Sequence, residues 1–458
     1  MPWTTCSGEL AERVPAVSAG CGGPENRLRQ PGHIDCFPAI MKPLASIVAM
    51  FLTIATAIAA TDLWDLPPLR YSETASHDPI AKLAEALAKG ERKVEGTTPL
   101  EKLRFVLKLL EIPEESQILV FSKTSKQNSL IHPANPRCLF FNENSYVGYV
   151  PGGDMEVITH DPALGSVYYL IGTHEPALQI TRDNSDCLSC HGTARTELIP
   201  GVLVRSVFPD EAGQPLLSLG TFLTDNSSPI PERWGGYYVT GRSSLPHLGN
   251  RTYKESDGRE LPRDSPELTT LAGRIDISRY PRTTSDIVSL MVLEHQCQLH
   301  NQLIAAGMNY RRSHWLQKSL DPAADPDADM AGKHADDAAR KIVDLLLFEN
   351  EADPGENGVE GDPAFQDAFT RRFPKSRDGR SLADFQLGTR LFKHRCSYMI
   401  YSKAFDALPA RIKSAVIARL HRVLESEPAA GNHPAIKASE RHKIAAILQE
   451  TLPAWSAK

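Results

Sequence analysis

The chain contains 458 residues, of which 41% are hydrophobic, and it carries a formal net charge of −6. This length allows one large hydrophobic core or two moderate ones. The nearly balanced charge offers no basic field for nucleic acid, and the small acidic excess points to no particular partner. Composition thus predicts a globular, mostly soluble protein whose chemistry must be sought in local motifs.

The N-terminal 60 residues resemble a targeting region rather than part of a fold. Residues 1–40 are rich in Gly, Pro and Arg, and we interpret them as an extension upstream of a true start at Met41. Residues 41–60 then follow the order of a secretory signal peptide, with a charged start, an apolar run and the cleavage site Ala-Ile-Ala at 57–59. An uncleaved membrane anchor is the alternative, because the run approaches spanning length. We expect cleavage and a periplasmic or secreted mature protein without a stable membrane span.

Residues 61–115 are predicted to form a helical segment, with helices over 79–89 and 100–110 where apolar residues recur at helical spacing. In residues 116–280, short β-branched and aromatic runs alternate with Asn, Pro and Gly, which is typical of strands and turns. The expected strands are 118–121, 146–150, 167–171, 202–208, 216–222 and 234–239.

Residues 281–458 are predicted to be a helical region with acidic loops at 321–336 and 349–363. The expected helices are 287–308, 338–348, 381–392, 409–424 and 437–451. The fold class is therefore α+β. A loop-rich mixed middle region precedes a mainly α-helical C-terminal region, with the change placed near residue 280.

The run Cys187-Leu188-Ser189-Cys190-His191 is the most specific chemical signal in the sequence. Its two thiols are spaced to meet the two vinyl groups of haem, its histidine can ligate the iron, and the string is typical of c-type haem attachment. With 8 Cys and 15 His in the chain, random placement produces it with a probability of roughly 0.005. Gly192 would let the backbone pass close to the porphyrin edge. We predict one covalent haem c, with thioethers to Cys187 and Cys190 and His191 as the proximal ligand.

Two other uses of the paired cysteines fit less well. A structural zinc site would need two further ligands, and no second Cys-x-x-Cys exists in the sequence. A redox dithiol would favour a thioredoxin-like βαβ setting, whereas residues 183–186 are typical of a loop. The remaining mature cysteines are Cys138, Cys297 and Cys396, which allow one disulfide and one free thiol but no disulfide framework.

The sixth iron ligand decides what such a haem does, since His or Met there favours electron transfer and an open position allows ligand chemistry. His295, where polar residues interrupt a helical apolar face, and His247 are possible distal ligands. For each, an ordinary hydrogen-bonded histidine is the alternative. Further candidates are His174, His300, Met291 and Met399. The aromatic residues Trp234, Tyr237 and Tyr238 either line the haem pocket or belong to an ordinary core.

The segments 186–192, 234–241 and 247–250 together resemble a group of bacterial secreted proteins that carry a single cytochrome-c-type motif. The resemblance continues through 285–301 and 390–402, so it covers most of the mature chain. It implies haem attachment at Cys187 and Cys190 and iron ligation by His191, and it implies no particular reaction. It does not extend to the small all-helical cytochromes c, so their methionine ligand cannot be placed here.

The mature chain is about four times larger than the ~100 residues that a single-haem carrier requires. We therefore expect an electron-transfer protein whose additional region docks a periplasmic redox partner protein. The alternatives are a peroxidase-like haem enzyme and a haem-based sensor, each with an open distal site. No catalytic residue is identified by the sequence.

Overall fold

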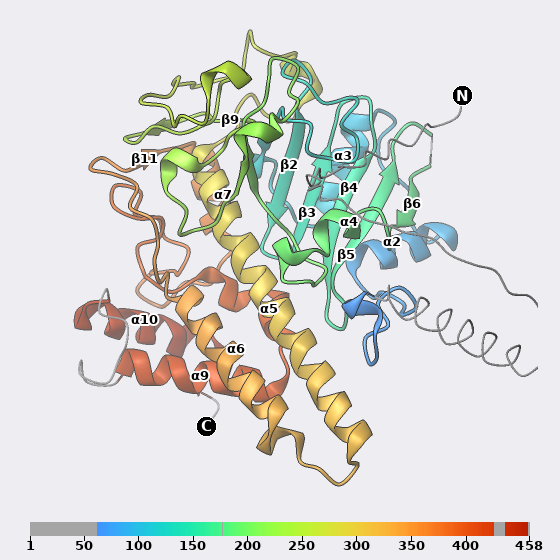
Figure 1. The fold of residues 1–458 in the computed structure, drawn as a ribbon, viewed down its shortest axis with the longest axis vertical. Coiled ribbons are helices and arrows are strands. Elements are labelled where there is room, and N and C mark those ends of the chain that lie inside the picture. The colour runs from blue at the N-terminus through green and yellow to red at the C-terminus, as the bar shows by residue number, and fades with distance from the viewer. Residues whose placement is uncertain (1–61, 176, 426–435, 457–458) are drawn as a thin grey trace, which may run out of the picture. The chain divides into compact units, whose positions relative to one another are not determined.

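The computed structural model describes residues 62–175, 177–425 and 436–456. The predicted extension at 1–40 and signal peptide at 41–60 lie outside the described residues. Residues Thr61–Lys458 form one compact unit, and its described part is a mixed α+β fold (Figure 1). In that part, no helix combines the length and apolarity needed to cross a membrane.

A seven-stranded antiparallel sheet forms the middle of the fold, in the order β6-β5-β4-β3-β2-β1-β9. Strands β2 to β6 follow one another as a meander. The expected strands at 118–121, 146–150 and 167–171 are confirmed, and β2, β4 and β6 were not predicted. The strands are β1 Ile118–Val120, β2 Arg137–Asn142, β3 Ser145–Tyr149, β4 Met155–Asp161, β5 Gly165–Gly172, β6 Gln179–Arg182 and β9 Tyr237–Tyr238.

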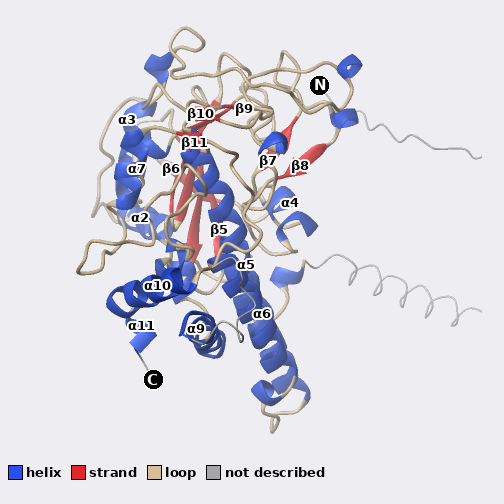
Figure 2. Ribbon diagram, turned by 90° about the vertical axis from the view of Figure 1, so that its left-hand side faces the viewer, coloured by secondary structure: helices blue, strands red, loops and turns tan. Residues whose placement is uncertain are grey.

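The two faces of this sheet pack on different helices. Alternating residues such as Phe140, Val147 and Val157 join one core cluster with residues of α2 (Pro79–Ala88) and α3 (Pro99–Leu109). On the opposite face, Leu139 and Tyr146 pack against the cluster that contains the long helix α5. Figure 2 shows α2 and α3 on one side of the sheet and α5 on the other. Period-two alternation thus buries both faces of the sheet.

Helices α2 and α3 begin where local capping chemistry predicts. The Asp78 carboxylate accepts hydrogen bonds from the backbone N–H groups of Ile80 and Ala81. Thr98 and Glu101 form a reciprocal capping box at the start of α3. Such caps satisfy backbone donors that have no partner inside the helix. Both predicted helices are confirmed to within a residue or two.

Helix α5 (Ile287–Leu320) is longer than the predicted 287–308. Its second half is polar but remains helical because α6 (Met330–Leu346) packs along it. Helix α6 starts inside the segment 321–336, which was wrongly expected to be entirely a loop. Asp336 and Asp337 are exposed while Ala331, Ala335 and Ala339 face the core. The remaining helices are α7 Pro363–Thr370, α8 Lys403–Asp406, α9 Ala410–Glu425, α10 Ala438–Thr451 and α11 Pro453–Ser456.

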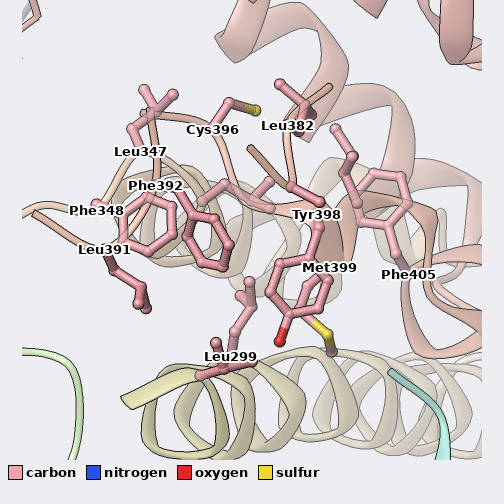
Figure 3. Close-up of a cluster of buried hydrophobic side chains, with 14 of the residues drawn as sticks. Leu299, Leu347, Phe348, Leu382, Leu391, Phe392, Cys396, Tyr398, Met399 and Phe405 are labelled. Carbon is pink, nitrogen blue, oxygen red and sulfur yellow. The ribbon is translucent and has the colours of Figure 1, made fainter. Parts of the chain in front are cut away.

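The predicted helix at 381–392 is wrong. This segment consists of turns closed by a single bridge between Phe385 and Phe392. Leu382, Leu391 and Phe392 are all inserted into one buried cluster around Tyr398 (Figure 3). Burying apolar side chains from this whole segment in one core outweighs its modest helix propensity.

Two short ribbons complete the loop-rich middle region. β7 (Arg205–Val207) pairs with β8 (Thr221–Leu223), while the first part of the expected strand 216–222 is a 3₁₀ turn at Leu217–Leu219. β10 (Arg242–Ser243) pairs with β11 (Val359–Glu360). This second pairing joins residues on either side of the expected change near 280, so the two regions share backbone hydrogen bonds.

Candidate haem site

The Cys-x-x-Cys-His motif lies on a single helical turn, α4 (Leu188–His191), which follows the edge strand β6. The motif was expected in a loop. Instead, the backbone N–H of His191 donates to the carbonyl of Cys187 at 2.9 Å. Residues three and four apart on a helix share a face, so the turn places Cys190 and His191 over Cys187. Buried Leu188 anchors the turn in a core cluster that also contains Trp64 and Tyr71.

The turn before α4 is held by one carboxylate. Asp183 Oδ1 accepts hydrogen bonds from the backbone N–H of Ser185 at 2.9 Å and of Cys187 at 3.3 Å. Lys126 forms ion pairs with Asp183 and Asp186, which tie this turn to the loop after β1. The loop expected at 183–186 is confirmed.

The two motif thiols are free and differ in exposure, with Cys187 half-buried and Cys190 exposed. Burial, assisted by the negative charge of Asp183, raises the pKa of the Cys187 thiol to about 12. It is therefore a neutral thiol at pH 7. Cys138, Cys297 and Cys396 are buried and also unpaired, so none of the described cysteines forms a disulfide.

The His191 ring is held in one tautomer. Its Nδ1 lies 2.9 Å from the carbonyl oxygen of Gly201. Because a carbonyl can only accept, Nδ1 carries the proton and Nε2 keeps its lone pair. Within the described residues, Nε2 has no hydrogen-bond partner. Burial lowers the pKa of His191, so the ring is neutral, as an iron ligand must be.

Two structural elements, β5 and α5, hold the peptide segment whose carbonyl orients His191. Tyr168 on β5 donates its hydroxyl to the same Gly201 oxygen at 2.7 Å, and its ring centroid is 5.4 Å from that of His191. Asn301 on α5 binds both the N–H and the carbonyl of Val202, at 2.8 and 2.6 Å. The α4 turn is therefore braced by the sheet and by α5, on whose side of the sheet it lies (Figures 1 and 2).

A charged, half-buried patch of the sheet faces the motif, formed by Arg137, Gly148 and Glu156. The Arg137 guanidinium spans Gly148 and binds Glu156 at 2.5 Å. A Cβ on Gly148 would lie 2.4 Å from that guanidinium. Burial tends to raise the pKa of Glu156, but Arg137 and hydrogen bonds from Ser125 and Gln127 outweigh it and lower the pKa.

This motif-facing patch fits a flat anionic cofactor. Both Arg137 and Glu156 influence the pKa of His191 electrostatically, which places them close to its ring. Among the described residues the buried Nε of Arg137 has no hydrogen-bond partner, and the atoms nearest to a Cβ on Gly148 belong to this flexible side chain. Arg205 lies close enough to Cys190 and Arg195 to respond to their charges. Such cations would suit the two carboxylates of the predicted haem.

Gly192 lies close to an aromatic side chain. A Cβ there would lie 2.5 Å from the indole of Trp64, which belongs to the 3₁₀ turn Leu63–Asp65. The approach of Gly192 to a porphyrin edge stays a prediction.

His295 and His247 are hydrogen-bonded core residues. His295 Nε2 lies 2.7 Å from Ser397 Oγ, its ring stacks on Phe348 at 4.2 Å, and burial lowers its pKa to about 3. His247 Nδ1 accepts from the N–H of Gly249, and burial lowers its pKa to about 4. No hydrogen bond or ring contact of the described residues joins either histidine to the motif. Their role as distal ligands stays a prediction without a supporting contact.

The other predicted site residues are dispersed. His174 is exposed, His300 binds the Tyr146 hydroxyl at 2.9 Å, and Met291 and Met399 belong to the core cluster around α5. Among the aromatic residues, Trp234 packs edge-on against His247, and Tyr238 lies 4.9 Å from Phe121. Burial raises the pKa of Tyr237, and the charge of Arg137 opposes that rise.

Sequence reasoning missed the residues that support His191. An isolated glycine in a strand, such as Gly148, is a known sign of close approach, and it was the only available signal. Tyr168 and Asn301 gave none, because their roles depend on contacts to Gly201 and Val202 across the fold. In the described part of the chain, no three His, Cys, Asp or Glu side chains are grouped to hold a metal ion. Comparisons with family models, curated proteins and solved structures returned no match for this chain.

Proposed function

We propose that this protein is a periplasmic or secreted c-type haem protein that carries one covalent haem and transfers electrons. One observation carries the proposal. Two reachable thiols and a neutral histidine share one helical turn, and the Gly201 carbonyl leaves His191 Nε2 free to ligate iron. The resemblance to secreted single-haem proteins and the predicted signal peptide at 41–60 support it from the sequence.

In this proposal each residue has a defined task. Cys187 and Cys190 would form the thioethers and His191 would be the axial ligand, while the bound haem supplies a reversible one-electron change at iron. Tyr168 and Asn301 keep the Gly201 carbonyl in place and so fix the His191 ring. Hydrogen bonding at Nδ1 also raises the basicity of the ligating nitrogen. Arg137 and Arg205 would offset the negative charge of the propionates.

A second role is favoured by the positions of the predicted distal ligands. His295 and His247 are both engaged in hydrogen bonds elsewhere. If no other side chain occupies the sixth position, the site would bind small ligands and act as a peroxidase-like enzyme or a sensor. Absorption spectra of the iron distinguish the two roles.

The first experiment tests haem attachment. The chain from Met41 is expressed in a host that attaches haem c in its periplasm, and the denatured protein is stained for haem peroxidase activity on a gel. We expect staining of the wild type and of Ser189→Ala, a control between the two thiols. Cys187→Ala with Cys190→Ala should abolish it. Staining that survives in the double variant would refute the proposal.

A second measurement separates the two roles. Ferric and ferrous absorption spectra are recorded before and after addition of carbon monoxide. A low-spin iron that ignores carbon monoxide supports electron transfer, because both axial positions are then occupied. A high-spin iron that binds it supports the enzyme or sensor role. His191→Ala should change either spectrum.

A further inference from the structure

A cavity of about 660 Å³ lies between the segment after the first 3₁₀ turn and helices α5 and α6. We propose that it binds a small organic anion with an apolar body and a carboxylate group. Its volume is in the range of small-molecule sites, which are about 300–1,000 Å³. None of Cys187, Cys190 and His191 lines it, so the proposal does not depend on haem attachment.

The walls of the cavity combine apolar and polar side chains. Small residues of α5, Ala305 and Ala306, create the space, and larger side chains enclose it. Trp315 and Leu316 are 41% and 44% exposed although they are large apolar groups. Exposed apolar surface in a concave site is typical of ligand binding. The apolar lining is Leu66, Pro67, Ala305, Ala306, Trp315, Leu316 and Ala338.

The charged lining residues are balanced, Glu197 and Asp337 against Arg312 and Lys341, so the anion site depends on Arg312 alone. Asp337 is matched by Arg340 at 2.7 Å and by Lys341 at 3.2 Å. Arg312 also lines the cavity but has no ion pair or hydrogen bond with any described residue, and Glu197 on the same lining does not pair with it. A guanidinium without a partner beside apolar walls suits a carboxylate, which it can bind through two parallel hydrogen bonds.

Further polar groups can orient the ligand. The side-chain amides of Gln302 and Asn309 line the cavity and form no hydrogen bond with any described residue. His334 uses Nδ1 for a 2.7 Å hydrogen bond with Ser313 Oγ, which leaves Nε2 available. A few polar groups within an apolar cavity are the usual arrangement by which a site fixes the orientation of its ligand.

The test uses isothermal titration calorimetry of the full mature protein with 2-naphthoate, decanoate and the neutral 2-naphthamide. We expect at least one of the two carboxylates to bind with one molecule per chain. Naphthamide should bind at least about tenfold more weakly than naphthoate. Arg312→Gln should weaken carboxylate binding about tenfold or more. Lys333→Gln is the matched control, because it removes an exposed charge of α6 outside the lining. It should bind like the wild type.

Trp315→Ala provides a second variant on an exposed position. It should weaken both carboxylates and naphthamide, because it removes an apolar wall. The proposal is overturned if neither carboxylate binds, if naphthamide binds as tightly as naphthoate, or if Arg312→Gln retains wild-type affinity with a normal circular dichroism spectrum. Haem staining is measured on the same samples, so failure of this site and failure of the haem proposal are distinguished.

Discussion

Polar groups have opposite surroundings in two regions of the molecule. These are the aromatic core that packs against α5 and the motif-facing patch of the sheet. In the aromatic core, formed by Phe348, Phe369, Phe385, Phe392 and Tyr398, the His295 ring stacks on Phe348 and lies edge-on to Phe392 and Tyr398, and burial keeps it neutral. Figure 3 shows Phe348, Phe392 and Tyr398 of this core. At the patch, Arg137 and Glu156 remain charged and half-buried. A histidine in the first region serves packing, whereas His191 beside the second keeps a nitrogen free for a ligand.

The same contrast appears in two arginine–glutamate pairs. Arg233 and Glu294 are joined at 2.8 Å with side chains only 3% and 0% exposed. Arg137 and Glu156 are joined at 2.5 Å with side chains 21% and 16% exposed. The deeper pair is part of the scaffold under α5, and the shallower pair can rearrange. Sites for a cofactor therefore belong where polar groups keep some access to solvent.

The largest expected effect on stability comes from truncating a buried side chain of the aromatic core. Phe392→Ala should lower the free energy of unfolding by about 3–5 kcal/mol, because it leaves a cavity among closely packed rings. Urea unfolding followed by circular dichroism measures it. Leu217→Ala is the control, since Leu217 is 76% exposed and should change little. A loss below ~1 kcal/mol would show that the core is loosely packed.

The next largest loss of stability is expected from breaking the buried ion pair between Arg233 and Glu294. Arg233→Leu should cost about 3–5 kcal/mol of stability, because it leaves the Glu294 carboxylate buried without its cation. Burial raises the pKa of Glu294, and Arg233 opposes that rise. The double variant Arg233→Leu with Glu294→Gln should recover part of the loss. If the single variant is as stable as the double one in urea, the pair is not a coupled unit.

Acid should destabilise the protein through His295. Its folded-state pKa of about 3 lies below the unfolded value of about 6.5. The unfolded chain therefore binds the proton first, and stability falls as pH drops from about 6.5 towards 3. We expect His295→Gln to remove a slope of about 1.4 kcal/mol per pH unit. Urea unfolding between pH 7 and 4 checks this, and an unchanged slope would contradict the buried neutral state.

The smallest effect on stability is expected at the motif-facing patch. Arg137→Leu should cost about 1 kcal/mol or less, because this pair is partly exposed to solvent. It should nevertheless change the absorption spectrum of the haem protein if Arg137 lies beside the cofactor. Arg242→Leu is the control, because the Arg242 side chain is 64% exposed. An unchanged spectrum would separate the patch from the haem site.

Local sequence patterns predicted the elements that depend on near neighbours. Apolar residues at helical spacing identified α2 and α3, and β-branched and aromatic runs identified β1, β3 and β5. The pentapeptide 187–191 identified the candidate site, although its helical turn was taken for a loop. The prediction of a helix over 381–392 was wrong because side chains of this segment pack into the core around Tyr398. That packing depends on residues that are distant in the chain.

The sequence by itself determined that two thiols and a histidine share one short motif behind a predicted signal peptide, because that chemistry requires only five consecutive residues. Only the tertiary structure decided what surrounds His191. The Gly201 carbonyl and the Tyr168 ring lie against it, Asn301 holds the neighbouring Val202 backbone, and the charge of Arg137 on β2 acts on its pKa. These contacts depend on strand register and helix packing over many residues, which no local pattern encodes.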